Sequence, residues 1–129
     1  MKKFIGEPLR LANGVILPLS RAVSANGFIF VSGQLGFDAG AKLAEGGIRE
    51  QTHQALANIE TILNAAGANA GDIVKVTGWL TREDDFPDFN DVYEKFFAAA
   101  PPPARSMVIS RLLVPGALVE LEAVAAVTA

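Results

Sequence analysis

The chain has 129 residues, of which 50% are hydrophobic and 19% charged, with a formal net charge of −3 and no cysteine. This composition excludes a disordered chain, a disulfide framework, a thiol nucleophile and a cysteine-ligated metal site, and the length suffices for a hydrophobic core. Because the charge is mildly negative and no basic cluster is present, we expect no dedicated nucleic-acid surface. We expect residues 1–129 to form one domain.

We expect no signal peptide in the first residues. Met1–Lys3 is basic, but Glu7, Pro8 and Arg10 follow before the apolar core of a signal peptide could form. No apolar run approaches the length that crosses a membrane. We therefore expect a cytoplasmic protein without a membrane partner.

Strand and turn signals dominate the beginning of the chain. Lys3–Ile5 indicates a short strand, and Ala22–Ala25 with Phe28–Ser32 indicates a β-hairpin. Asn26 and Gly27 join the two hairpin strands, because both residues tolerate the positive φ angles of a type I′ turn.

A glycine-containing segment follows the hairpin. Ser32–Gln34 ends the second strand, and Leu35–Gly47, which contains four glycines, indicates a loop. Gly33 has two explanations, of which a β-bulge is the commoner and the close approach of a backbone or ligand is the other.

Ile48–Ala66 is the clearest predicted helix, and Gly67 suits its C-terminal end. Its apolar stripe follows helical spacing. The stripe consists of Ile48, Thr52, Ala55, Ile59, Ile62, Leu63 and Ala66. His53, the one histidine, lies away from the stripe and is predicted to face solvent, which removes it as a general base or metal ligand within its own subunit.

Asp72–Thr81 alternates as a strand, and a second helix begins after it. One strand face holds Val74, Val76, Gly78 and Leu80, and the other holds Lys75, Thr77 and Trp79.

Pro87 lies in the first turn of the second helix, beside four aspartates. These are Asp84, Asp85, Asp88 and Asp91. We interpret them as acids that match the helix dipole, in preference to an oxygen-rich metal site.

The second helix has a predicted buried stripe that is mostly aromatic. It consists of Phe86, Phe89, Tyr93, Phe96 and Phe97. Asn90 falls beside these rings, and a buried amide needs partners, so we expect it to fasten a neighbouring loop or backbone.

The element order predicts an α+β fold with a mixed sheet. Two helices cover one face of such a sheet, and the high hydrophobic content favours a second subunit on the other.

The last third of the chain carries the charge that most needs an explanation. Pro101–Pro103 holds the chain extended, and Arg105 then shares one face of the next strand with apolar Met107 and Ile109. Buried charge is costly without a partner. Glu120 and Glu122 project from one face of the last strand, so an internal ion pair is one explanation.

A small-anion site is the other explanation for Arg105. The planar guanidinium matches a carboxylate through two hydrogen bonds, and a nearby glutamate could orient or deprotonate a water molecule. The spacing of the residues leaves both explanations open and names no reaction.

The chain resembles the Rid (YjgF-like) family of enamine/imine deaminases from about Pro18 to Ala126. The resemblance is carried by Pro18–Val23, Val31–Gln34, Gly47-Ile48, Gln51-Thr52, Gln54–Leu56, Asn58-Ile59, Asp72–Thr77, Asp85-Phe86, Asn90, Val92-Tyr93, Phe96-Phe97, Pro103–Ser106 and Glu120–Ala125. It implies a chorismate-mutase-like α+β fold, a homotrimer with sites between subunits, and neither cofactor nor metal. It also implies a small 2-enamino or 2-imino acid substrate, such as 2-aminoacrylate, hydrolysed to a 2-oxo acid and ammonia.

The resemblance also implies roles for particular residues. Arg105 would bind the substrate carboxylate, and Glu120 would position or activate water, helped by backbone groups around Met107. Ser32 and Gly33 would line the cleft, and Asn90 would hold its shape. An iminium carbon is already electrophilic, so this division of roles needs no covalent nucleophile.

Two positions depart from the family pattern. Leu19 stands where the family often has an aromatic residue, and Met107 stands where it often has cysteine. These departures motivate one alternative, a non-catalytic trimer that binds small acids or a protein partner. A deaminase of a larger amino-dienoic acid of the aminomuconate type is a further alternative. The ribonuclease label that some relatives carry gains no support from the charge balance.

Overall fold

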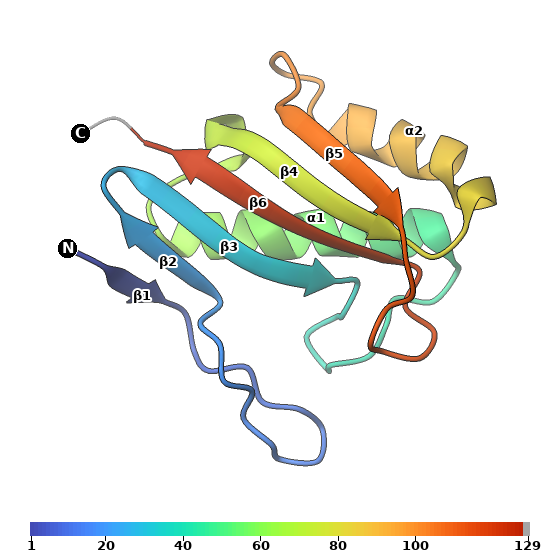
Figure 1. Cartoon of the computed structure of the whole chain (residues 1–129), viewed down its shortest axis with the longest axis horizontal. Helices are drawn as coiled ribbons and strands as arrows, with labels where there is room; N and C mark the ends of the chain where they lie inside the picture. Colours follow the sequence, from blue (N-terminus) through green and yellow to red (C-terminus); the bar gives the residue numbers. More distant parts are fainter. Residues whose placement is uncertain (128–129) are drawn as a thin grey trace.

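The computed structural model of the protein describes residues 1–127 and has the α+β architecture that the sequence predicts (Figure 1). Its strands are β1 (Lys3–Ile5), β2 (Ala22–Ala25), β3 (Phe28–Leu35), β4 (Ile73–Leu80), β5 (Ala104–Ile109) and β6 (Val119–Ala126). Its helices are α1 (Ile48–Ala65) and α2 (Phe86–Phe96), with short 3-10 turns at Ala70–Asp72 and Glu83–Asp85. Within the described residues, neither helix could span a bilayer.

The strands form one mixed sheet in the order β1-β2-β3-β6-β4-β5. Among the strands of residues 1–127, only β4 and β5 pair in parallel, and the helix α2 lies in the connection between them. The predicted hairpin is confirmed, since β2 and β3 pair around Asn26 (φ 53°) and Gly27 (φ 82°). Positive φ at both central residues is the type I′ geometry that suits the twist of the strands.

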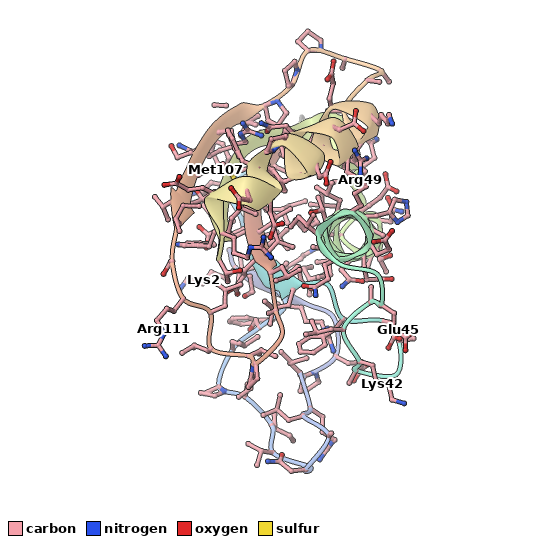
Figure 2. All side chains as sticks on the ribbon, turned by 90° about the vertical axis from the view of Figure 1, so that its right-hand side faces the viewer. Lys2, Lys42, Glu45, Arg49, Met107 and Arg111 are labelled. Atoms are coloured by element: carbon pink, nitrogen blue, oxygen red, sulfur yellow. The ribbon has the colours of Figure 1, made fainter. Side chains whose placement is uncertain are left out.

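Both helices cover the same face of the sheet, as Figures 1 and 2 show. Side chains from this face and from the helices form the core. Its largest fully buried members are Phe89, Ile29, Leu56, Ile59, Leu63, Leu80, Leu121, Val76, Val119 and Thr52. At the helix–helix contact, Arg49 of α1 pairs with Asp88 at 2.9 Å and Asp91 at 2.7 Å. Two of the four aspartates therefore join the helices, and His53 is exposed as predicted.

The buried face of β4 differs from the prediction at one residue. Val76, Gly78 and Leu80 are buried as expected, but Val74 is 46% exposed and Ile73 is buried in its place. The pairing of β4 with β6 is irregular between Ile73 and Lys75. This irregularity shifts the alternation by one residue, so the strict period-2 pattern fails at the start of the strand.

The sheet face opposite the helices is open and partly apolar. Phe28 and Phe30 on β3 are 44% and 48% exposed, and Val108 on β5 is 52% exposed. Glu120 and Glu122 of β6 project on this same side, as predicted, while Leu121 between them is buried. Large aromatic side chains on a solvent-facing sheet are typical of a surface that meets another chain.

The end of β3 is fixed to α1 by a close backbone approach. Asn58 donates to the carbonyls of Leu35 and Phe37 at 3.1 and 2.9 Å. Between them lies Gly36, where an added Cβ would come within 2.7 Å of the Gln51 carbonyl oxygen in α1. Only a residue without a side chain allows this approach.

The substitution Gly36→Ala is therefore expected to destabilise the fold by about 1–3 kcal/mol, because α1 must move away from the loop. Thermal unfolding should show a Tm lower by about 5–10 °C. Gly40→Ala is the matched control, since its Cβ would meet only the Asp38 side chain, at 3.3 Å. Equal Tm values for the two variants would contradict this account.

Candidate active site

Arg105 lies on β5, the edge strand of the sheet, and points toward α2. Its partner in the parallel register is Val76, which is buried beneath the helices. The guanidinium carbon lies 4.8 Å from the centre of the Tyr93 ring and 5.6 Å from that of Phe89. Its Nη1 donates a 2.8 Å hydrogen bond to Asn90 Oδ1. The charge is thus held by neutral groups of one helix.

Of the two explanations of Arg105, the ion pair with a glutamate of the last strand is wrong for the single chain. Within residues 1–127 Arg105 forms no salt bridge, and its one side-chain hydrogen bond goes to Asn90. Arg105 lies on the helix-covered side, whereas Glu120 lies on the open side with β4 between their strands. The sheet itself separates the two charges.

Two predictions about the second helix also need correction. Asn90 does not fasten a loop or backbone, because its carbonyl accepts from the Arg105 guanidinium. Phe86 was expected in the buried stripe, but it is 40% exposed, with its ring centre 5.7 Å from the Arg105 guanidinium. Phe86 is the first residue of α2, whose buried residues begin at Phe89.

Met107 lies two residues after Arg105 on the same side of β5 and is partly buried. Its side chain fills a notch over Gly78 of β4, where an added Cβ would come within 2.5 Å of the methionine sulfur and 2.7 Å of Leu121 Cδ2. Figure 2 shows Met107 toward β5, away from Arg49 at the contact between the helices. The missing side chain at position 78 thus accommodates the long side chain at 107.

Glu120 faces Gly33 across the pairing of β3 with β6. The register of β3 shifts between Val31 and Gln34, and a Cβ at Gly33 would overlap the Glu120 carboxylate. The bulge explanation of Gly33 agrees with this register irregularity, whereas the close neighbour of Gly33 is a side chain and not the backbone or ligand of the other explanation. Burial, and then the negative charge of Glu122, raise the pKa of the Glu120 carboxyl above its ordinary value.

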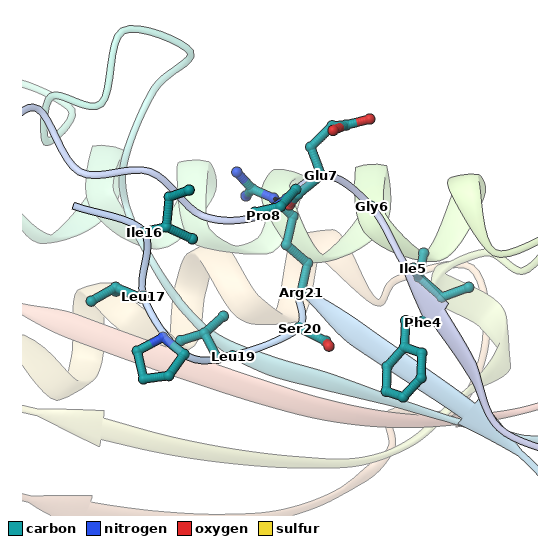
Figure 3. A pocket seen from close by; sticks show the side chains of 11 residues that line it. Phe4, Ile5, Gly6, Glu7, Pro8, Ile16, Leu17, Leu19, Ser20 and Arg21 are labelled. Carbon is teal, nitrogen blue, oxygen red and sulfur yellow. Dashed lines mark hydrogen bonds between the residues drawn. The ribbon is translucent and has the colours of Figure 1, made fainter. Parts of the chain in front are cut away.

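Ser32 precedes Gly33 on β3, and Leu19 lies in the segment before β2. The Ser32 hydroxyl donates to the Ser20 carbonyl at 2.5 Å, which ties the segment containing Leu19 to β3. Leu19 is 41% exposed and lines an open groove of about 560 Å³, with Phe4 and Leu17 among the other lining residues (Figure 3). This groove separates the N-terminal strand from the segment before β2.

The seven candidate residues thus fall into two groups. We call Asn90, Arg105 and Met107 the arginine cluster, and Leu19, Ser32, Gly33 and Glu120 the glutamate cluster. The arginine cluster lies at the edge strand beside α2. In the glutamate cluster, Gly33 faces Glu120, and Ser32 joins β3 to the segment that holds Leu19. Across residues 1–127, no three His, Cys, Asp or Glu side chains are placed to share a metal ion.

Sequence reasoning assigned Phe89 and Tyr93 to the core and missed their contact with Arg105. Their spacing with Asn90 carries a weak signal, since positions 89, 90 and 93 lie on one side of a helix. What the sequence lacked was the topology, which places β5 parallel to β4 and therefore under α2.

The chain matches the family described as endoribonuclease L-PSP over residues 11–127. It therefore belongs to this family, which includes the Rid (YjgF-like) proteins. The bovine protein named 2-iminobutanoate/2-iminopropanoate deaminase is 43% identical over 115 residues, covering 88% of this chain and 83% of the bovine one.

Two solved structures have the same fold. The Rid family protein YyfA from Yersinia pestis gives a TM-score of 0.88 at 35% identity, covering 98% of this chain and 100% of its own. The structure of E. coli TdcF with bound serine gives a TM-score of 0.87 at 31% identity, covering 98% and 99% of the two chains.

Proposed function

We propose that the protein hydrolyses small 2-enamino and 2-imino acids to 2-oxo acids and ammonia. The observation that carries this proposal is the guanidinium of Arg105, which is partly buried and held by rings and an amide but neutralised by no carboxylate within residues 1–127. Such a group favours a bound anion, and its planar fork fits a carboxylate. The deaminase name of the bovine relative supplies the reaction class.

In the proposed reaction, Arg105 donates two N–H bonds to the substrate carboxylate and so places carbon 2 for attack. Water adds to that carbon, and the electrons of the C=N bond move to nitrogen. Glu120 takes one proton of the water and passes it to the nitrogen, which gives a carbinolamine with a hydroxyl and an amino group on carbon 2. Glu120 then takes the hydroxyl proton and passes it to the amino nitrogen as the C–N bond breaks, so that ammonia leaves and the oxygen becomes the carbonyl of the 2-oxo acid.

One chain alone does not bring Arg105 and Glu120 to one ligand, because they lie on opposite faces of the sheet. We therefore propose that the site forms between two copies, in a homotrimer that buries the open face. The exposed Phe28 and Phe30 support this, since they are large apolar residues on that face. Sedimentation equilibrium should give three times the 13.6 kDa chain mass.

The test is to release an imine with a threonine or serine dehydratase and to follow its decay with and without the protein. Faster decay with stoichiometric 2-oxo acid and ammonia is expected. Decay at the buffer rate for both imines would overturn the proposal for these substrates. A matched sample of heat-denatured protein controls for catalysis by exposed amines.

A non-catalytic trimer that binds small acids is the second candidate. The observation that favours it is serine bound in the structure of the related TdcF. Saturable binding of 2-oxobutanoate without turnover of any imino acid would support this candidate and exclude the first.

A further inference from the structure

We propose that Phe89 and Tyr93 are positioning residues that fix the orientation of the Arg105 guanidinium. This inference rests on the proposed function, since the purpose of a fixed orientation is to meet a carboxylate with both arms of the fork. The two rings touch no substrate in this account. They act through Arg105 alone.

The rings are suited to this role because they are rigid. Phe89 is fully buried and Tyr93 is 5% exposed. Their ring centres lie 5.5 Å apart, and the ring centres of Tyr93 and Phe97 lie 4.7 Å apart. Each ring therefore packs against the next. A guanidinium above such ring faces is attracted by their quadrupoles, and the attraction grows where water is excluded.

The rings and Asn90 leave most N–H donors of the Arg105 guanidinium available within residues 1–127. A carboxylate beside Arg105 would hold the guanidinium firmly, but it would occupy the fork and neutralise the charge. Rings hold it from the face and consume no N–H donor, and the amide of Asn90 uses Nη1 only. The rings and the amide therefore hold the guanidinium in place without neutralising its charge. That charge remains available to bind an anion.

Tyr93 shows that the ring is the important part of that side chain. Its hydroxyl is buried and has no hydrogen-bond partner within residues 1–127. Burial raises the pKa of Tyr93 to about 12, against the opposing effect of the Arg105 charge, so the phenol stays neutral beside the cation. Tyr93→Phe keeps the ring and removes only the unpaired hydroxyl. It is therefore the matched control.

The experiment compares wild type with Phe89→Leu and Tyr93→Phe by NMR of arginine side chains labelled with nitrogen-15. Ring currents should move the Arg105 Nε–H proton upfield of that of exposed Arg111. Loss of the Phe89 ring current moves this resonance in any case, so the readout of orientation is the order parameter of the Arg105 Nε–H bond. In Phe89→Leu this order parameter should fall toward that of Arg111, whereas Tyr93→Phe should retain it. In the deaminase assay, Phe89→Leu should raise KM about 10-fold and change kcat much less.

An unchanged Arg105 order parameter in folded Phe89→Leu would overturn the inference, whatever the activity. Phe89→Met, which conserves volume, repeats the test if the leucine variant does not fold. The NMR result needs no substrate, so it decides the role of the rings even if wild type hydrolyses no imine. That last outcome would refute the proposed function alone.

Discussion

Arg105→Ala is expected to lower kcat/KM for 2-iminobutanoate by about 100- to 1,000-fold. The substitution removes two charge-assisted hydrogen bonds to the substrate carboxylate and the alignment that they impose on carbon 2. Imine decay in a coupled dehydratase assay measures the loss directly. Fold stability should change little, because Arg105 contributes only one hydrogen bond and its ring contacts at the sheet edge.

Arg111→Ala is the matched control, since Arg111 is an exposed arginine that follows the same strand. It should keep wild-type activity. Arg105→Lys should fall between the two, because an ammonium supplies the charge without the planar fork. Equal activity of Arg105→Ala and wild type would remove the central residue of the proposal.

Glu120→Gln is expected to lower kcat by about 100-fold or more, because an amide cannot take a proton from water. The same substitution should raise stability at neutral pH. Folding raises the pKa of this carboxyl, so between its ordinary and its folded pKa the native state holds a proton that the unfolded chain has lost. Stability therefore falls as pH rises through that window.

The measurements are Tm and kcat/KM across pH for wild type and Glu120→Gln. The two Tm curves should coincide at low pH and separate as pH rises, with the glutamine variant above. Wild-type kcat/KM should fall as pH drops through the raised pKa. Glu122→Gln, a change on the same strand face, is the control. It should keep activity and shift the acid limb to lower pH, because the Glu122 charge contributes to the raised pKa.

Local sequence signals predicted most of the fold because turns and helix faces are determined by residues that lie close together in the chain. Asn26 and Gly27 accept positive φ angles, which alone determines the hairpin turn. The helical spacing of Ile48, Ile59 and Leu63 determines which side of α1 is buried. Where a local pattern failed, as at Val74, a pairing irregularity with a strand distant in sequence was the cause.

The arrangement of the candidate site could not be predicted from residue spacing, because it depends on the order of the strands in the sheet. Alternation correctly placed Arg105 with Met107 and Glu120 with Glu122, but it could not relate one strand face to the other. That relation follows from the strand order, with β4 between β5 and β6. The family resemblance supplied the candidate residues, and the topology divided them into the arginine cluster and the glutamate cluster.

The location of these two clusters on opposite faces of one sheet has a genetic consequence. In the proposed trimer each chain contributes one half of one site and the other half of another. Two alleles damaged in different halves, one at Arg105 and one at Glu120, could then rebuild working sites when their products assemble together. With random mixing, about a quarter of the sites would receive both intact halves. The activity of a cell that carries both alleles would therefore depend on how the two kinds of chain mix within each trimer.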